Sequence, residues 1–223
     1  MSNEAKAITV AVIGGTGKEG SGLAFRWANA GYNVIIGSRT VDKAEQAASE
    51  LNTQLSGVEV RGMTNEQAAQ QAGWVVLTVP YSAHKSTLES IKTQVQGKVL
   101  IDVTVPIVPP NFMTPTLPAG RTAAEEAQAL LGTGVKVVSA FQNVSAVHLK
   151  NLSHSANCDV LVAGDDADAK QVAITLADAA GMRGVDVGPL ANAIVAETLT
   201  PVLLGVNKRY GVKGAGIKIT ELG

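Results

Sequence analysis

The chain has 223 residues, of which 46% are hydrophobic and 17% are charged, and its formal net charge is −1. This composition is typical of a globular protein with one domain or slightly more. A charge so close to zero gives no electrostatic reason to expect binding to nucleic acid or to an anionic membrane. The aromatic content of 4% also argues against base-stacking surfaces.

The compartment is indicated by a lone cysteine and by the N-terminal residues. Cys158 has no second cysteine to pair with, which fits a reducing compartment, and its apolar surroundings favour a buried filler over a reactive thiol. The first residues, MSNEAKA, lack the apolar core of a signal peptide, and no apolar run approaches the roughly 20 residues that span a bilayer. We therefore expect a soluble, cytoplasmic protein.

Residues 8–20, ITVAVIGGTGKEG, join a β-branched apolar run to a glycine pair and then to Gly15-x-Gly17-x-x-Gly20. A strand, a glycine turn and a helix in this order are typical of a dinucleotide-binding site. We expect Gly15 to permit the tight turn, Gly17 to let the backbone approach a pyrophosphate, and Gly20 to let the helix pack against the strand. The helix, expected after Gly20 and up to Gly31, then directs its free N–H groups at the phosphates.

Strands and helices alternate along the next hundred residues. Strands are expected at residues 33–37, 58–61, 74–79, 98–103 and 135–140, and helices at 41–51, 83–93, 121–131 and from Thr64, where Gln67 completes a capping box. Continuous apolar strands separated by helices predict a parallel sheet covered on both faces. The predicted fold class is therefore α/β, with an N-terminal Rossmann-like doubly wound sheet whose ligand crevice lies at the carboxyl ends of the strands.

Residues 105–118 contain five of the eight prolines, which excludes a helix or a central strand there. Such a segment is either a functional loop or a rigid surface connector, and the sequence leaves both interpretations open. Residues 141–155 lack periodicity and are expected to cross into a small C-terminal α/β lobe.

The expected C-terminal lobe starts with a strand at 158–163 and a helix capped by Asp165 that ends near Gly181. Short strands at 185–187 and 217–219 flank a helix at 194–210, which Pro201 should kink. We predict an NADP-binding domain at residues 1–144 and a small lobe at residues 145–223 that completes the cleft.

The end of the second strand indicates which dinucleotide binds. NAD-binding proteins place an acidic residue there for the ribose hydroxyls, whereas this chain has Ser38 and Arg39, with Lys43 one helical turn further on. A guanidinium and a hydroxyl suit a 2′-phosphate, so the sequence favours NADP(H). The competing interpretation is a surface arginine beside a serine at a helix start.

Candidate acid–base groups are sparse. His84 follows the fourth strand and is placed to flank the cofactor, while His148 and His154 lie in the crossing segment; for each, a solvated or core role competes. One cysteine and scattered histidines cannot form a zinc site, and Asp165 and Asp166 are explained as helix caps. Hydride transfer between two conjugated cofactors needs close, dry placement rather than a proton donor, and the sequence fits that demand better.

Together these segments resemble the NADPH-dependent F420 reductases (F420H2:NADP oxidoreductases) along nearly the whole chain. The resemblance is carried by VIGGTGKEGSGLAFRWANAGYNVIIGSRTVDKA, LTVPYSAH, IDVTVP, VVSAFQNVSAVHL and the GPL…LTP…KRY…GIKI tail. It implies reversible hydride transfer between NADPH and the deazaflavin of coenzyme F420, in a cleft between two lobes. It also implies a homodimer.

Carried over by position, the resemblance assigns the site residues. The residues implied to hold NADP(H) are Thr16, Gly17, Lys18 and Glu19 at the pyrophosphate and ribose, Ser38, Arg39 and Lys43 at the 2′-phosphate, and Pro80, Val105 and Ala146 near the nicotinamide. With them we group Gly15, Val79, His84 and Gln142 as cofactor-binding, and Ala215 with its glycines as the approach for the deazaflavin. No residue is assigned a catalytic role, and no metal ligand is expected.

One position departs from the family. Gln142 stands where these enzymes usually carry a histidine, and glutamine hydrogen-bonds without titrating near neutral pH. Two alternatives therefore stay open: an NADPH-dependent reductase of a free flavin, a ferric chelate or a small imine or carbonyl, and a non-catalytic NADP-binding sensor.

Overall fold

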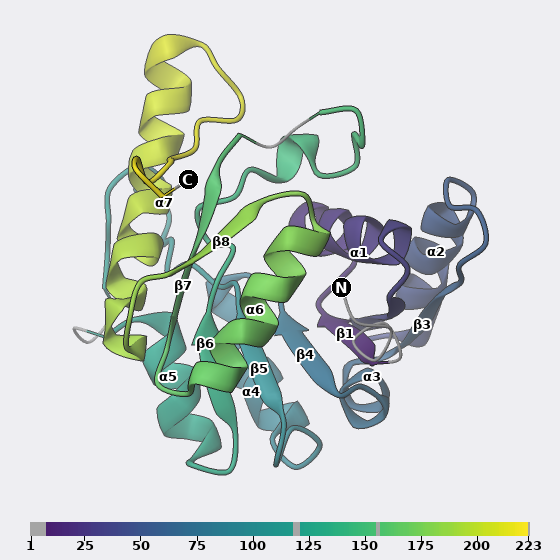
Figure 1. Cartoon of the computed structure of the whole chain (residues 1–223). Coiled ribbons are helices and arrows are strands. Elements are labelled where there is room, and N and C mark those ends of the chain that lie inside the picture. The colour runs from purple at the N-terminus through teal and green to yellow at the C-terminus, as the bar shows by residue number, and fades with distance from the viewer. Residues whose placement is uncertain (1–7, 118–120, 155–156, 223) are drawn as a thin grey trace.

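The computed structural model describes residues 8–117, 121–154 and 157–222. Within them, eight strands form one sheet in the order β3-β2-β1-β4-β5-β6-β7-β8 (Figure 1). The strands are β1 (Thr9–Ile13), β2 (Asn33–Ser38), β3 (Val60–Thr64), β4 (Trp74–Leu77), β5 (Val99–Asp102), β6 (Lys136–Ser139), β7 (Asp159–Gly164) and β8 (Arg183–Asp186). The predicted α/β class with a doubly wound sheet is confirmed.

The first six strands run parallel, because each is joined to the next by a helical crossover. Strand β7 pairs with β6 in the antiparallel sense, and β8 is parallel to β7. The residues expected to form a second lobe therefore extend the same sheet beyond β6. The division of function at residue 144 stays a prediction.

Helices cover both faces of the sheet. They are α1 (Lys18–Asn29), α2 (Val41–Asn52), α3 (Asn65–Gln71), α4 (Tyr81–Ile91), α5 (Ala123–Leu131), α6 (Ala167–Ala179) and α7 (Ala193–Tyr210), with short 3₁₀ turns η3 (Ala146–His148) and η4 (Leu190–Asn192). Helices α1, α2 and α6 share one buried apolar cluster with the sheet, and α3, α4 and α5 share the other. Burial on both faces explains the continuous apolar strands.

Several expected boundaries are wrong by a few residues. Helix α1 begins at Lys18, so that Gly20 lies inside its first turn, and β3 lies two residues later than expected. The reason is that Thr64 both ends β3 and caps α3, through the predicted capping box with Gln67. The cap of α6 is Asp166, whose carboxylate accepts from Ala169 N at 2.8 Å, and not Asp165.

The proline-rich segment contains neither helix nor strand over its described residues, 105–117, as expected. The strand expected at residues 217–219 is absent. There the chain makes only isolated bonds, in which Asp159 N donates to Ile217 O and Ile219 N donates to the Asp159 carboxylate. Cys158 is half-buried beside Met182, and burial raises the pKa of its thiol, which fits the expected filler role.

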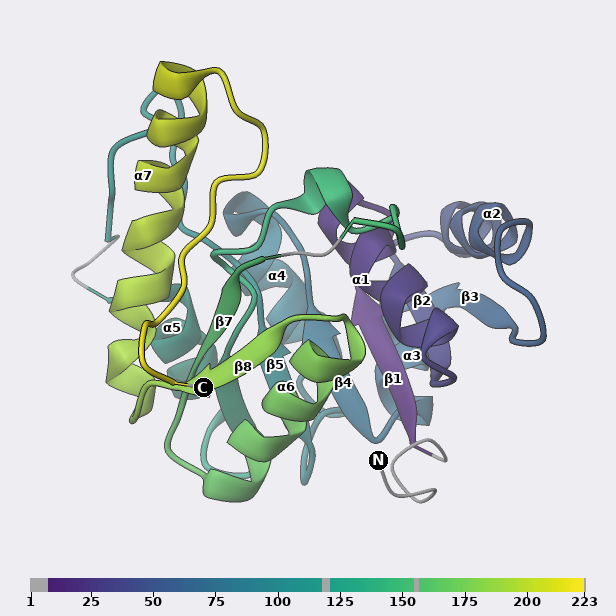
Figure 2. The ribbon, with the colours of Figure 1, turned by 45° about the horizontal axis from the view of Figure 1, so that its top comes forward.

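Helix α7 extends past the end of the sheet, and the tail after Gly211 returns alongside it (Figure 2). Gly211 ends the helix in the left-handed conformation (φ 67°), which reverses the chain. Contrary to expectation, one run is apolar and long enough to qualify as a membrane span by length and composition, Leu190–Tyr210. Its inner side packs against α5 and carries the buried Glu197, and Pro201 lies within the uninterrupted helix.

Candidate functional site

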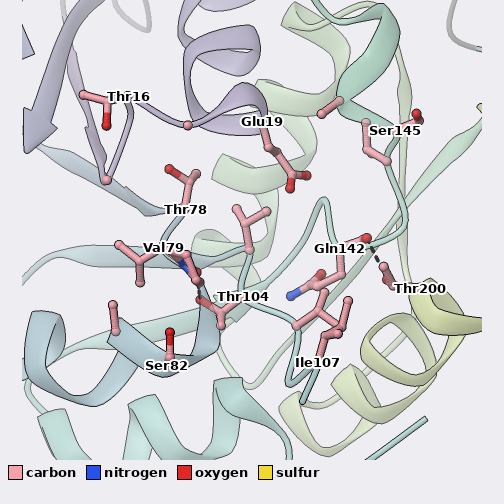
Figure 3. A pocket seen from close by; sticks show the side chains of 18 of the residues that line it. Thr16, Glu19, Thr78, Val79, Ser82, Thr104, Ile107, Gln142, Ser145 and Thr200 are labelled. Carbon is pink, nitrogen blue, oxygen red and sulfur yellow. Dashed lines mark hydrogen bonds between the residues drawn. The ribbon is translucent and has the colours of Figure 1, made fainter. Parts of the chain in front are cut away.

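A cavity of about 1070 Å³ opens at the carboxyl ends of β1, β2, β4, β5 and β6 and is closed by the η3 segment, α7 and the tail. Its lining includes twelve of the fifteen predicted site residues: Thr16, Gly17, Glu19, Ser38, Arg39, Lys43, Val79, Pro80, Val105, Gln142, Ala146 and Ala215. Gly15, Lys18 and His84 do not line it. Figure 3 shows the side chains meeting from both sides, with Thr16 and Thr78 opposite Ser145 and Thr200.

The glycine loop leaves the phosphate approach open. The positive φ of the turn is at Gly14 (71°) and not at Gly15, which instead donates to Val12 O and Gly37 O, both at 3.1 Å. A Cβ on Gly20 would lie 2.4 Å from Thr78 Oγ1, so the close packing expected of Gly20 is confirmed. A Cβ on Gly17 would meet only Gly14 O, at 3.9 Å, which leaves room for a pyrophosphate beside the N-terminus of α1.

One end of the cavity is cationic. Ser38 ends β2 and is buried, whereas Arg39 and Lys43 are exposed at the start of α2 and line the same end of the cavity. The one acid between them, Asp42, does not line it. A hydroxyl beside two cations is the donor set that a 2′-phosphate requires, so these residues fit NADP(H).

The middle of the cavity is mostly apolar. Val79, Pro80, Val105 and Ile107 line it, and they follow the ends of β4 and β5. Two threonines sit among them, but their hydroxyls are occupied: Thr78 donates to Ile13 O at 3.0 Å and Thr104 donates to Val79 O at 3.4 Å. This wall suits a planar ring and offers it no proton donor from these hydroxyls.

Glu19 lies in the first turn of α1 and points into the cavity (Figure 3). Its Oε1 is buried and has no hydrogen-bond partner within the described part of the chain. Burial raises the pKa of this carboxyl to about 8, because the charged form loses its solvation. At neutral pH, Glu19 is therefore mostly a neutral acid beside the phosphate approach.

Gln142 is 2% exposed and also lines the cavity. Its Nε2 donates to Asp102 O at 2.7 Å and to Ser139 Oγ at 2.8 Å, and its backbone carbonyl accepts from Thr200 Oγ1 at 2.7 Å. The preceding residue, Phe141, is buried with a φ of 74°, a strained value for a residue other than glycine. Packing against Trp27, with ring centroids 5.7 Å apart, holds that bend.

His84 is not part of this cavity. It is 2% exposed, and its Nε2 lies 2.6 Å from Asp102 Oδ2. Burial lowers the pKa of this histidine, but the charge of Asp102 and its hydrogen bond outweigh that effect, so the pKa of His84 is raised above its ordinary value. The ring stacks on Tyr81 in the wall of a second cavity between α4 and α5, and His84 acts as a core residue there.

The other histidines do not form a catalytic pair either. The rings of His148 and His154 stack with their centroids 4.0 Å apart. Arg26, which is buried, fixes their segment by donating to the carbonyls of His148, Leu149, Asn151 and His154. Within residues 8–117, 121–154 and 157–222, no three His, Cys, Asp or Glu side chains gather in a way that could hold a metal ion.

The far wall includes residues that the sequence reasoning missed. Thr200, Leu203, Leu204 and Asn207 line the cavity from α7. Their spacing of i, i+3, i+4 and i+7 marks one face of a helix and was the available signal. Asn207 Oδ1 accepts from Ala215 N at 2.9 Å and so ties the tail to α7. Of the two glycines expected to leave room beside Ala215, Gly214 packs against the His148 ring and Gly216 packs against Cys158.

Comparison with known proteins gives relatives along the whole chain. The sequence profile described as "NADP oxidoreductase coenzyme F420-dependent" matches residues 9–106. The F420-dependent NADP reductase of Methanothermobacter thermautotrophicus is 46% identical over 221 residues, which is 96% of this chain and 95% of the relative. That of Methanocaldococcus jannaschii is 40% identical, over 96% of this chain and 98% of the relative.

A solved structure is also similar over its full length. A protein of Arthrobacter sp. FB24, described as a candidate F420-dependent NADP-reductase, superposes with a TM-score of 0.80 at 27% identity. The match covers 96% of this chain and all of the other. The similarity therefore includes α7 and the tail as well as the glycine loop.

Proposed function

The chain belongs to the family of coenzyme F420-dependent NADP oxidoreductases, and we propose from this premise that it transfers a hydride reversibly between NADPH and coenzyme F420. The observation that carries the proposal is one cavity that runs from the cationic end at Arg39 to α7 and the tail. A cavity of about 1070 Å³ has room for more than a dinucleotide's nicotinamide end.

We assign NADP(H) to the first wall of the cavity, which is formed by the glycine loop and by the residues that follow β2, β4 and β5. The backbone from Gly15 to Lys18 and the N-terminus of α1 hold the pyrophosphate, with Thr16 and Glu19 at the adjoining ribose. Ser38, Arg39 and Lys43 hold the 2′-phosphate. Val79, Pro80 and Val105 flank the nicotinamide, and Ala146 closes over it from η3.

We assign the deazaflavin to the second wall of the cavity, which is formed by the η3 segment, α7 and the tail. Leu203 and Leu204 present an apolar surface to its ring, Ala215 allows the tail backbone to approach, and Gln142 lies between the two cofactors. Bound together, the cofactors supply the chemistry, which is hydride transfer between C4 of the nicotinamide and C5 of the deazaflavin. The protein's part is to hold two rings close, parallel and dry.

None of the side chains assigned to the nicotinamide or to the deazaflavin has to transfer a proton in this reaction. The hydroxyls of Thr78, Thr104 and Thr200 all donate to backbone carbonyls, and His84 is paired with Asp102 outside the cavity. Glu19, the neutral acid that points into the cavity, lies at the phosphate approach, so these hydroxyls and His84 leave the apolar middle of the cavity without a proton donor from their side chains. This supports transfer between two cofactors over reduction of a carbonyl, which needs a proton donor there.

Three further features belong to the proposal. The chain works in the cytoplasm as a homodimer, and its partners are the two cofactors, without nucleic acid or membrane. Residues 1–144 bind NADP(H), and residues 145–223 complete the cleft for F420. The exposed side chains of Val195 and Val202 on α7 are 51% and 46% accessible and favour contact with a second copy. Sedimentation velocity measures that assembly.

The function is tested by following the deazaflavin absorbance band with NADPH and F420. We expect the band to disappear on reduction and to return with F420H2 and NADP⁺. Turnover with FMN or a ferric chelate but none with F420 would instead favour the alternative reductase. Tight NADPH binding without turnover of any acceptor would favour a sensor.

A further inference from the structure

The backbone of the tail is hydrogen-bonded to the rest of the protein at every second residue from 213 to 219, although residues 212–222 contain no strand. The four bonds join Lys213 O to Ser145 Oγ (3.1 Å), Ala215 N to Asn207 Oδ1 (2.9 Å), Ile217 O to Asp159 N (2.8 Å) and Ile219 N to Asp159 Oδ2 (2.7 Å). Alternate residues of an extended chain face the same side. One edge of the tail therefore lies against the η3 segment, α7 and β7.

Two glycines between the bonded residues let the tail lie close to the protein. A Cβ on Gly214 would lie 2.9 Å from the His148 ring, and one on Gly216 would lie 2.6 Å from Cys158 Cβ. Glycine also gives the free chain more conformational freedom than other residues do, so ordering this segment loses more entropy. A chain end of this kind stays ordered only where bonds tie it down.

Asp159, the first residue of β7, connects the tail to the wall of the cavity. It is 0% exposed, and its N–H and its carboxylate both bond to the tail. Its carbonyl accepts from Asn143 Nδ2 at 2.6 Å. Asn143 is itself 2% exposed and lines the cavity. A movement of the tail at Asp159 would therefore also disturb the cavity wall.

Arg183, the first residue of β8, joins Asp159 to the end of the tail. Its Nε and Nη2 donate to the two Asp159 carboxylate oxygens, at 3.0 and 2.6 Å. The same guanidinium donates to Ile219 O at 2.8 Å and to Leu222 O, where the tail ends beside β8 (Figure 2). A bidentate pair of this kind fixes the orientation of both groups as well as their charge.

We propose that the Asp159–Arg183 ion pair is a positioning device that keeps the tail ordered and so holds Ala215 at the second wall for the deazaflavin. The inference rests on the proposed function. A tail that is already ordered loses less conformational entropy when the cofactor binds, which strengthens binding. Neither residue is among those that line the cavity, so the pair acts on the cofactor only through the tail.

The test compares Arg183→Met with Lys170→Met, because each removes the cation from an ion pair of β8. Lys170 pairs with Asp186 at 2.7 Å, at the opposite end of β8 from Arg183. The double variant Asp159→Asn/Arg183→Met also removes the carboxylate, so that no unpaired charge stays buried. Each protein is assayed for KM and kcat with F420, for the dissociation constant of NADPH and for its melting temperature.

We expect Arg183→Met to raise the KM for F420 at least ~10-fold, because binding must then order the tail. The kcat should stay within about twofold of the wild-type value, since saturating cofactor selects the ordered tail. The double variant should recover melting temperature relative to Arg183→Met but keep the raised KM, which separates positioning from stability. Lys170→Met should match the wild type with both ligands.

Trypsin provides a readout that needs no cofactor. Lys213 and Lys218 are exposed and lie within the bonded segment. Cleavage after them requires local release of the tail, so its rate reports how often the tail opens. Arg183→Met and the double variant should be cut at these two lysines at least ~10-fold faster than the wild type, and Lys170→Met should not. Mass spectrometry identifies the cleavage sites.

An unchanged KM for F420 in Arg183→Met and in the double variant would overturn the inference. A KM that recovers together with the melting temperature would do the same, as would wild-type rates of cleavage. If Arg183→Met does not fold, the double variant carries the comparison. Failure of the proposed function shows differently, as an absence of F420 turnover in wild-type protein, and the trypsin rates then decide whether the ion pair holds the tail.

Discussion

The two walls of the cavity are held in place by different kinds of bond. The first wall follows directly from β1, β2, β4 and β5, and the parallel ladder of backbone hydrogen bonds fixes it. The second wall consists of the η3 segment, α7 and the tail, which single side chains tie together. The ties are Glu197 to Ala123 N (2.7 Å), Thr200 to Gln142 O (2.7 Å) and Asn207 to Ala215 N (2.9 Å).

This difference determines what a substitution does. The first wall is held by many backbone hydrogen bonds between parallel strands. Replacing one of its side chains therefore removes a ligand contact and leaves the wall in place. A tie is one side chain with one or two hydrogen bonds, and removing it lets the second wall shift. Apart from the buried acid Glu19, variants of the first wall should therefore change affinity alone, whereas variants of the second should change both stability and the position of the second cofactor.

The largest effect is expected for Arg39→Ala. Loss of a charge-assisted bond to the 2′-phosphate should weaken NADPH binding about 10- to 100-fold, or 1.5–3 kcal/mol. NADH lacks that phosphate, so its dissociation constant should stay the same, and the melting temperature should not move. Fluorescence titration measures both ligands, and Arg61→Ala, outside the cavity on β3, serves as the matched control. Unchanged NADPH affinity would remove the 2′-phosphate assignment.

Glu197→Ala should have the next largest effect, and on stability. Both carboxylate oxygens of Glu197 accept from the N-terminus of α5, at Ala123 N and Ala124 N, and the residue is 1% exposed. Burial raises the pKa of this carboxyl to about 8, while the two backbone donors lower it. Losing this tie should cost about 2 kcal/mol in urea unfolding and weaken F420 binding.

Glu197→Gln separates the tie from the volume of the side chain. It keeps one acceptor and the packing, so it should lose about half as much stability as Glu197→Ala. NADPH affinity should remain near the wild-type value in both variants. A parallel loss of NADPH binding would show that the two walls are not independent.

The first wall was largely predictable from sequence, and the same physical difference explains why. The glycine spacing, the strand ends and the Ser38–Arg39 pair are local patterns, because each residue stands a fixed number of positions from the strand that carries it. The errors were small: Gly14 rather than Gly15 adopts the positive φ, and α1 begins at Lys18.

The second wall was only partly predictable. Two of the three ties join residues 58 and 74 positions apart, Gln142 to Thr200 and Ala123 to Glu197, and no local pattern encodes such pairs. His84 illustrates the same limit, because it lies on α4 and its partner Asp102 lies at the end of β5, a contact that makes His84 a core residue. The resemblance supplied Ala215 and Gln142, but the orientation of the Gln142 amide required the structure.

The pH dependence of the free energy of unfolding tests the protonation of Glu19, which lies in the first wall. The folded chain keeps this carboxyl protonated up to about pH 8, whereas the unfolded chain ionises it near 4.5. Between these values the folded state binds the extra proton, so the free energy of unfolding falls as pH rises. Glu19→Gln should remove about 1–2 kcal/mol of this dependence, a value reduced because the residue keeps partial exposure.

The measurement is urea unfolding of wild type and Glu19→Gln at pH 6 and pH 9, without ligand. The variant should be the more stable protein at pH 9, and the difference should shrink at pH 6. Parallel pH curves for the two proteins would contradict the assignment of a neutral acid at this position.

The smallest effect is expected for Thr200→Val. The substitution keeps the shape of the side chain but removes the hydroxyl that donates to Gln142 O. We expect a loss of about 0.5–1 kcal/mol in stability and a two- to fivefold weaker binding of F420, with NADPH binding unchanged.

Thr198→Val is the matched control, because the Thr198 hydroxyl bonds only to carbonyls of its own helix, Ile194 O and Val195 O. It should leave the affinities for both cofactors unchanged. If Thr200→Val instead weakens NADPH and F420 equally, the tie at Gln142 positions the whole cavity, and the second wall cannot move without the first.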